Sequence, residues 1–166
     1  MTEEKRQQAL YILRKRGDPF LTALYFDRPG PAIAPAASGS PVPARKAAAP
    51  EKLPGAVRIP AGAAVYYGCL PGTACTEEQA AGWAAASPLR DGFRTITAET
   101  LPAFRNRGVA SACLSCLLRS ESGPFLYLVR RDNRPSLRLA LSCGFLPVPG
   151  AGGEIPVSLA KNPNIV

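Results

Sequence analysis

The sequence predicts an α/β fold with a mixed sheet in a single domain. One observation supports the fold class and another the number of domains. Residues 93–148 show patterns in the order strand, helix, strand, helix, strand, which is typical of parallel crossovers with helices layered on a sheet. A chain of 166 residues with 46% apolar residues is long enough for one domain with a hydrophobic core and too short for two full ones. We therefore expect a single domain over residues 1–166.

The N-terminal part predicts one helix and one strand before its composition changes. Residues 3–16 have acidic residues in the first turn and basic residues in the last, which favours a helix. Residues 20–26 (FLTALYF) are aromatic and apolar enough for a strand. Residues 28–55 contain seven of the eighteen prolines and many alanines, a composition that predicts a loop or flexible linker.

The middle of the chain predicts strand and then helix. Residues 56–70 are expected to form a strand or a pair of strands. Thr76 is followed by two glutamates and a glutamine, so it predicts the N-cap of a short helix over residues 76–86. Trp83 lies in that alanine-rich segment, and we expect its side chain in the core.

The C-terminal half has the clearest pattern. Residues 93–100 alternate and predict a strand, and residues 107–120 repeat polar positions every three or four residues and predict a helix. Residues 125–129 (FLYLV) are continuously apolar, as in a strand that is covered on both faces. Asn133 predicts the N-cap of a second helix, which ends before Gly144, and another strand follows.

The positive charge is concentrated in one stretch. The formal net charge is +8 and the pI is near 9.6, which favours an anionic partner. Between Arg94 and Arg138 the chain has eight arginines, no lysine and three acidic residues, so this stretch carries +5 of the +8. The planar guanidinium of arginine suits phosphate better than a lysine ammonium does. A phosphate-bearing ligand is therefore favoured over nucleic acid or an anionic membrane surface.

Two further features of composition exclude classes of chemistry. The absence of histidine removes the commonest general base, the Ser–His and Cys–His nucleophilic pairs and most zinc sites. The five cysteines are odd in number and the charged N-terminus does not resemble a signal peptide, so we expect a reducing cytoplasm and no disulfide framework. Cys113 and Cys116 form a CxxC inside a predicted helix, and we expect them to be small buried residues and not metal ligands. No apolar run approaches the length of a membrane span.

A phosphate-binding turn is predicted between the strand over 93–100 and the helix over 107–120. The sequence Arg105-Asn-Arg-Gly-Val-Ala110 puts a glycine and two arginines at the start of a helix. A helix N-terminus presents unpaired N–H groups and a partial positive charge, and a glycine lets a ligand approach the backbone. The turn is neither a Walker A loop nor a dinucleotide fingerprint, and the hexamer alone is a weak signal.

Two longer segments resemble motifs of the GNAT superfamily of N-acetyltransferases. The run Thr100-Leu-Pro-Ala-Phe-Arg-Asn-Arg-Gly-Val-Ala-Ser-Ala-Cys-Leu114 resembles motif A, in which a strand ends in a Pro-x-aromatic-Arg-x-x-Gly-x-Gly/Ala turn. The run Asp132-Asn-Arg-Pro-Ser-Leu-Arg-Leu-Ala-Leu-Ser-Cys-Gly-Phe145 is similar to motif B. The resemblance covers residues 93–148 and implies a GNAT-like fold whose acetyl-coenzyme A-binding core is this segment.

The resemblance implies an enzyme that transfers an acetyl group from acetyl-coenzyme A to a primary amine of a small molecule, peptide or protein. The backbone of Arg107–Ala110 would hold the pyrophosphate, the strand end at Glu99 and Thr100 would pair with the pantetheine arm, and Asn133 would lie beside it. The full set implied to bind the coenzyme is Glu99, Thr100, Arg105, Asn106, Arg107, Gly108, Val109, Ala110, Ser111 and Asn133. The protein would supply positioning, an oxyanion-type contact and proton removal. Dimers are common in the family, which makes a homodimer an expectation.

Two features depart from the family pattern, and the general base has two candidates. Many members have a tyrosine in the second helix that protonates the departing thiolate, and Ala140 stands in its place, with Ser142, Cys143 or water as substitutes. Glu99 is the candidate general base because it ends the motif A strand, and Glu154 is a second candidate. The proline-rich stretch replaces much of the N-terminal half that usually shapes the acceptor pocket.

Two other functions stay open on the sequence alone. A catalytically degenerate GNAT-like protein would bind coenzyme A or a protein partner without turnover, which Ala140 and the reduced N-terminal half favour. A basic RNA- or DNA-binding module is motivated by charge alone and lacks a nucleic-acid motif. An acetyltransferase with an RNA-borne amine acceptor would combine transfer with nucleic-acid binding, and the sequence does not identify the acceptor.

Overall fold

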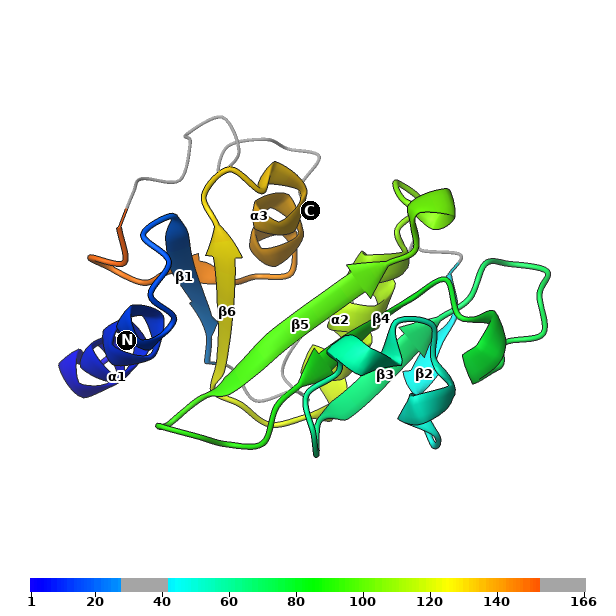
Figure 1. Cartoon of the computed structure of the whole chain (residues 1–166), viewed down its shortest axis with the longest axis horizontal. Helices are drawn as coiled ribbons and strands as arrows, with labels where there is room; N and C mark the ends of the chain where they lie inside the picture. The colour runs from blue at the N-terminus through cyan, green and yellow to red at the C-terminus, as the bar shows by residue number, and fades with distance from the viewer. Residues whose placement is uncertain (28–41, 153–166) are drawn as a thin grey trace. The chain divides into compact units, whose positions relative to one another are not determined.

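The computed structural model describes residues 1–27 and 42–152, and it confirms the predicted α/β fold with a mixed sheet. The helices are α1 (Glu3–Lys15), α2 (Val109–Ser120) and α3 (Arg134–Ser142). The strands are β1 (Leu21–Phe26), β2 (Ala44–Lys46), β3 (Ala64–Gly68), β4 (Gly82–Ala86), β5 (Arg94–Thr100), β6 (Phe125–Arg130) and β7 (Leu146–Pro147) (Figure 1). Hydrogen bonds join the strands in the order β2-β3-β4-β5-β6-β1-β7, in which β5 and β6 are parallel and the other neighbours antiparallel.

The chain divides into two compact units. The described residues of the first unit are 1–27, 89–95 and 123–152, and those of the second unit are 42–88 and 96–122. Strand β5 contributes to both, because Arg94 and Thr95 pair with β6, whereas the residues from Ile96 to Thr100 pair with β4. Among the described residues, no helix has both the length and the apolar content that crossing a membrane requires.

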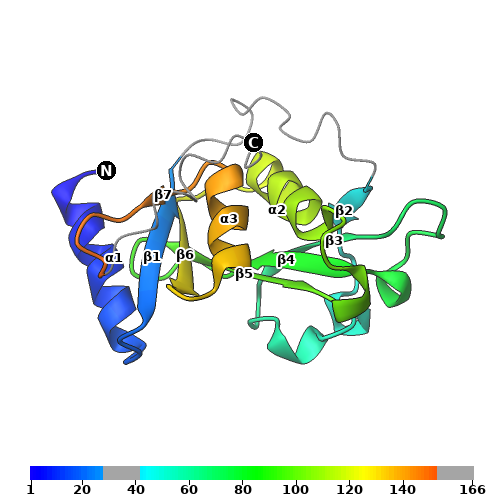
Figure 2. The same cartoon turned by 90° about the horizontal axis from the view of Figure 1, so that it is seen from above.

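In the first unit, helices cover both faces of the pair β1 and β6. Alternate strand residues point to opposite faces. Ala23 and Leu126 pack with Ile12 of α1 on one face. On the other face Phe26 packs against Phe145, three residues after the end of α3, with ring centroids 5.4 Å apart. Figure 2 shows α1 and α3 on the two sides of these strands, so the expectation that β6 is covered on both faces is confirmed.

In the second unit, small residues let α2 lie close to the sheet. A Cβ added at Gly68 would lie 3.0 Å from the Cys113 Sγ atom, and one added at Gly82 would lie 3.0 Å from a methyl group of Val109. The opposite face is covered by the segment between β2 and β3, where Leu53 is buried against Trp83. The indole N–H of Trp83 donates to the Pro54 carbonyl at 2.9 Å. Trp83 is therefore a core residue, as expected.

The predicted helix over residues 76–86 is wrong. Residues Glu77–Gln79 form one 3-10 turn, η4, and β4 begins at Gly82. The Thr76 side chain makes no capping hydrogen bond. The alanines of this segment favour a helix locally, but β4 needs small side chains because α2 packs on one of its faces. Tertiary packing therefore overrides the local preference.

The expected linker over residues 28–55 contains ordered structure wherever the chain is described. Residues 28–41 lie outside the described residues. From residue 42 onward, β2 pairs with β3, the turn η2 (Pro50–Lys52) follows, and Leu53 is 4% exposed. The composition of this stretch predicted a loop because it was expected to bury too little apolar surface to offset the entropy lost on ordering. Pro43 instead accepts from the Cys69 N–H through its carbonyl at 3.3 Å, beside the start of β2.

Candidate functional site

The predicted phosphate-binding turn follows the end of β5. The Leu101 N–H donates to the Ala81 carbonyl at 2.9 Å, which holds the strand end against the segment before β4. The 3-10 turn η5 (Pro102–Phe104) comes next. Asn106 and Gly108 then both adopt left-handed backbone conformations, with φ values of 63° and 78°. The chain can reverse direction here because glycine adopts this conformation without strain and asparagine with little.

Helix α2 begins directly after Gly108 without a side-chain cap. The first intrahelical bond runs from the Ala112 N–H to the Gly108 carbonyl at 3.0 Å, so the N–H groups of Val109, Ala110 and Ser111 precede the helical ladder. Val109 is buried at 1% exposure and anchors the turn, whereas Arg105, Asn106, Arg107, Gly108 and Ser111 are exposed. The structure therefore places an uncapped helix N-terminus next to two exposed arginines, an arrangement that favours an anion.

The Glu99 side chain lies on the face of the sheet opposite α2. In the ladder Glu99 is opposite Trp83, and both side chains point toward the segment between β2 and β3. The Arg58 guanidinium donates to the Glu99 Oε1 atom at 2.9 Å. The Glu99 side chain is 21% exposed, so this carboxylate is partly accessible and already has a cationic partner. No local sequence signal pointed to Arg58, because it is 41 residues away in the chain.

Asn133 belongs to the first unit, unlike the other predicted coenzyme-binding residues. Its side-chain oxygen accepts from the Ser136 N–H at 3.3 Å, which confirms the predicted N-cap of α3. The helix ends before Gly144, whose φ of 97° is the left-handed conformation expected after a helix C-terminus. The Asn133 amide is thus partly committed to capping.

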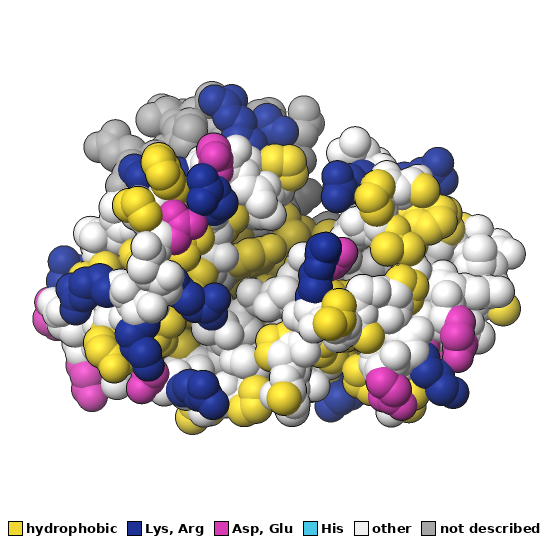
Figure 3. All heavy atoms as spheres, viewed as in Figure 1, with side chains coloured by type: hydrophobic (Ala, Val, Ile, Leu, Met, Phe, Trp, Pro, Cys, Tyr) yellow, Lys and Arg dark blue, Asp and Glu magenta, His cyan; other side chains and the backbone are white. Residues whose placement is uncertain are grey.

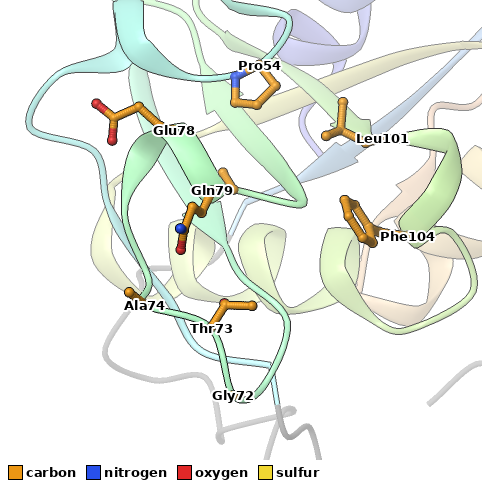
Figure 4. A pocket seen from close by; sticks show the side chains of 9 residues that line it. Pro54, Gly72, Thr73, Ala74, Glu78, Gln79, Leu101 and Phe104 are labelled. Atoms are coloured by element: carbon orange, nitrogen blue, oxygen red, sulfur yellow. The ribbon is translucent and has the colours of Figure 1, made fainter.

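A cavity of about 570 Å³ opens in the second unit near the end of β5 (Figure 4). Leu101 and Phe104 form one wall, and residues of the loop between β3 and β4 form another. The complete lining is Pro54, Gly72, Thr73, Ala74, Glu78, Gln79, Ala80, Leu101 and Phe104. The volume is in the range of pockets for small ligands. Sequence reasoning missed this cavity because its residues come from four separate segments.

Comparison with solved structures places this arrangement among known folds. A crystal structure of a protein from Novosphingobium aromaticivorans, assigned to the GNAT acetyltransferases, superimposes with a TM-score of 0.52 at 16% sequence identity, over 76% of this chain and 59% of that one. The fold is GNAT-like. A Drosophila protein gives a lower TM-score of 0.49 at 13% identity, over 76% of this chain and 47% of that one.

The GNAT-like fold is supported by structure and not by overall sequence similarity. No protein-family model and no curated protein sequence matches the chain. The chain spans about three fifths of the length of the Novosphingobium structure. Identity at this level relates the folds and leaves the activity, the substrates and the partners of this chain as proposals.

Ala140, which the resemblance predicts at the position where many GNAT enzymes have a tyrosine, is fully buried. The Ser142 hydroxyl, a potential substitute, donates to the Leu139 carbonyl at 2.8 Å. Cys143, the other substitute, is half-buried at the end of the helix. Glu154 lies outside the described residues. Among the residues that are described, no group of three or more His, Cys, Asp or Glu side chains could hold a metal ion.

Two arginines of the arginine-rich stretch, Arg130 and Arg131, have structural contacts. Arg130 binds Asp18 at 2.9 Å and Asp132 at 3.3 Å, and Arg131 donates to the Pro19 carbonyl at 2.9 Å. Both guanidinium groups also lie near the Phe20 ring, at 5.1 and 5.8 Å. These two arginines therefore join β6 to the start of β1. Figure 3 shows Lys and Arg side chains scattered over the displayed face and not gathered into one patch.

A methyl group at Gly82 should push β4 away from the end of β5, the strand that leads to the predicted phosphate-binding turn. A Cβ added there would lie 2.6 Å from the Glu99 carbonyl oxygen, a backbone atom that cannot rotate away. We expect Gly82→Ala to lower the free energy of unfolding by about 1–3 kcal/mol, because β4 and β5 must separate locally. Urea denaturation followed by circular dichroism measures this loss. A change below about 0.5 kcal/mol, the range of neutral substitutions, would mean that the strands are not held this closely.

Proposed function

We propose that the chain is a GNAT-type N-acetyltransferase that transfers an acetyl group from acetyl-coenzyme A to a primary amine. The observation that carries the proposal is the uncapped N-terminus of α2, which follows an Arg-x-x-Gly turn at the end of β5 in a GNAT-like fold. A pyrophosphate is the kind of ligand that such a helix start binds. The acceptor is a small molecule, a peptide or a protein.

The residues around this turn would divide the work of binding. The N–H groups of Val109, Ala110 and Ser111 point out of the helix start and would donate to the pyrophosphate, and Gly108 would allow it to approach. Arg105 and Arg107 are exposed on either side of Asn106 and would add charge-assisted hydrogen bonds. The backbone of Glu99 and Thr100 and the side chain of Asn133 would contact the rest of the coenzyme.

Glu99 would accept the proton of the attacking amine, directly or through a water molecule. Its carboxylate lies on the face of the sheet that is not covered by α2, and it is partly exposed. The Arg58 guanidinium donates to the Glu99 Oε1 atom at 2.9 Å and so orients the carboxylate. In turn, Glu99→Gln is expected to lower kcat with little change in the affinity for acetyl-coenzyme A.

The first test of the proposal is isothermal calorimetry of the protein with acetyl-coenzyme A. We expect saturable binding, and we expect Arg107→Glu to weaken it at least about tenfold, because a charge-assisted hydrogen bond is replaced by repulsion of the pyrophosphate. Arg90→Glu is the matched control, because Arg90 is exposed and its hydrogen bonds to Phe93 use the backbone alone. Failure of the folded wild-type protein to bind would refute the proposal, and equal weakening by both variants would refute the assigned site.

A second function is favoured by one observation, the fully buried alanine at position 140. A GNAT-like protein without a proton donor for the departing thiolate would bind coenzyme A, or a protein partner, and not turn over. A thiol-release assay with a panel of primary amines separates the two functions. Thiol release that Glu99→Gln reduces supports the acetyltransferase, whereas tight binding without release for any amine supports the binding protein. A cytoplasmic location and a homodimer stay predictions.

A further inference from the structure

The loop between β3 and β4 brings two cysteines together. Cys69 directly follows β3, and Cys75 lies six residues later, before η4. Their Sγ atoms are 2.6 Å apart. The sulfur–oxygen contacts of this unit are much longer: the Sγ atoms of Cys69, Cys113 and Cys116 lie 3.8, 3.7 and 3.7 Å from the carbonyl oxygens of Thr76, Gly82 and Ala44. The loop thus holds the two thiols close to the bonding distance of about 2.05 Å.

We propose that Cys69 and Cys75 form a reversible disulfide that closes the loop over residues 69–75. This loop supplies Gly72, Thr73 and Ala74 to the lining of the cavity in the second unit. Gly72 has a φ of 85°, which marks the reversal of the chain at the loop tip. Closing the loop would fix one wall of the cavity, so the redox state would control how well that wall is ordered. The proposal does not depend on the acetyltransferase function.

The two thiols differ in accessibility, which sets the order of the reaction. Cys69 is fully buried, and burial raises the pKa of its thiol to about 12, so it is a weak nucleophile at neutral pH. Cys75 is partly exposed. The co-reactant is a low-molecular-weight disulfide such as glutathione disulfide. The Cys75 thiolate attacks it and releases one small thiol; Cys69 then loses its proton and attacks the Cys75 Sγ, which expels the second. Two protein thiols are oxidised and one small disulfide is reduced.

The sequence allows a direct test by mass spectrometry. Trypsin separates the cysteines into three peptides: residues 59–90 contain Cys69 and Cys75, residues 108–119 contain Cys113 and Cys116, and a third peptide contains Cys143. The full-length protein is incubated with glutathione disulfide, alkylated under denaturing conditions and digested. We expect peptide 59–90 to lose two hydrogen atoms and carry no alkyl group, and to regain two alkylation sites after treatment with dithiothreitol.

The remaining peptides and one variant serve as controls. The CxxC of peptide 108–119 lies on α2 and should retain both alkylation sites, although its sequence is the more familiar redox motif. In Cys75→Ser, Cys69 should stay reduced because it is buried.

Thermal unfolding gives a second test. Oxidation of the wild type should raise Tm by roughly 5 °C, since a ring of seven residues is closed, and it should leave the Tm of Cys75→Ser unchanged. Full alkylation of peptide 59–90 after oxidation, or a stable glutathione adduct on it, would overturn the proposal.

Discussion

Trp83→Ala is expected to lower the free energy of unfolding by about 3–5 kcal/mol, a large part of the stability of a domain of this size. Trp83 is 1% exposed and lies in the core cluster with Leu53, Val65 and Tyr67. Truncation leaves a cavity between β4 and the segment that covers it, and the Pro54 carbonyl loses the indole donor that lies 2.9 Å away. The change therefore removes packing and a partly buried hydrogen bond together.

Trp83→Phe separates these two contributions. Phenylalanine keeps most of the apolar volume and loses the N–H donor, so we expect a smaller loss of about 0.5–1.5 kcal/mol, the net contribution of one hydrogen bond. Trp83 is the sole tryptophan of the chain, so urea denaturation must be followed by far-ultraviolet circular dichroism and not by tryptophan fluorescence. Equal losses in both variants would mean that the hydrogen bond dominates, and a loss below about 1 kcal/mol for alanine would contradict the observed packing.

The second large effect is expected from alkaline pH, through Tyr127. Burial raises the pKa of the Tyr127 phenol to about 12, and a hydrogen bond with Ser136 opposes this shift only in part. The folded state therefore holds this proton more tightly than the unfolded state, whose phenol titrates near 10. The contribution to stability is fully present below pH 10 and is lost as the pH rises to 12, at a cost of roughly 3 kcal/mol. Burial also raises the pKa of the Cys113 and Cys69 thiols, which adds to the loss at high pH.

Tyr127→Phe tests this prediction because it removes the ionisable group and keeps the ring against Phe145, at 5.8 Å between centroids. Urea denaturation at pH 8 and at pH 11, in the presence of a reductant, should show a smaller loss of stability for the variant than for the wild type. The difference should be roughly 1 kcal/mol or more, since one proton contributes about 1.4 kcal/mol per pH unit. Tyr11→Phe is the control, because Tyr11 is 47% exposed on α1. Parallel losses in all three proteins would contradict the assignment to Tyr127.

The sequence by itself determined the elements whose signals are local. The charges at both ends of α1, the apolar run of β6 and the Asn133 cap of α3 each act within a few residues, and the structure has all three. The turn before α2 was predicted as well. Gly108 can adopt the left-handed backbone conformation found there without strain, and this property does not depend on distant contacts. The resemblance of residues 93–148 to the GNAT motifs also implied the fold that the structural comparison shows.

Only the tertiary structure decided the elements whose preference depends on distant partners. β4 is a strand, although its alanines favour a helix, because α2 packs closely on one face and Trp83 needs the other. β1 comes first among the strands in the chain and yet pairs with both β6 and β7, which are more than 90 residues away, and no local pattern of the sequence specifies such a pairing. The contacts of Glu99 with Arg58 and of Cys69 with Cys75 depend on where the backbone brings these residues, and residue type alone does not carry that information.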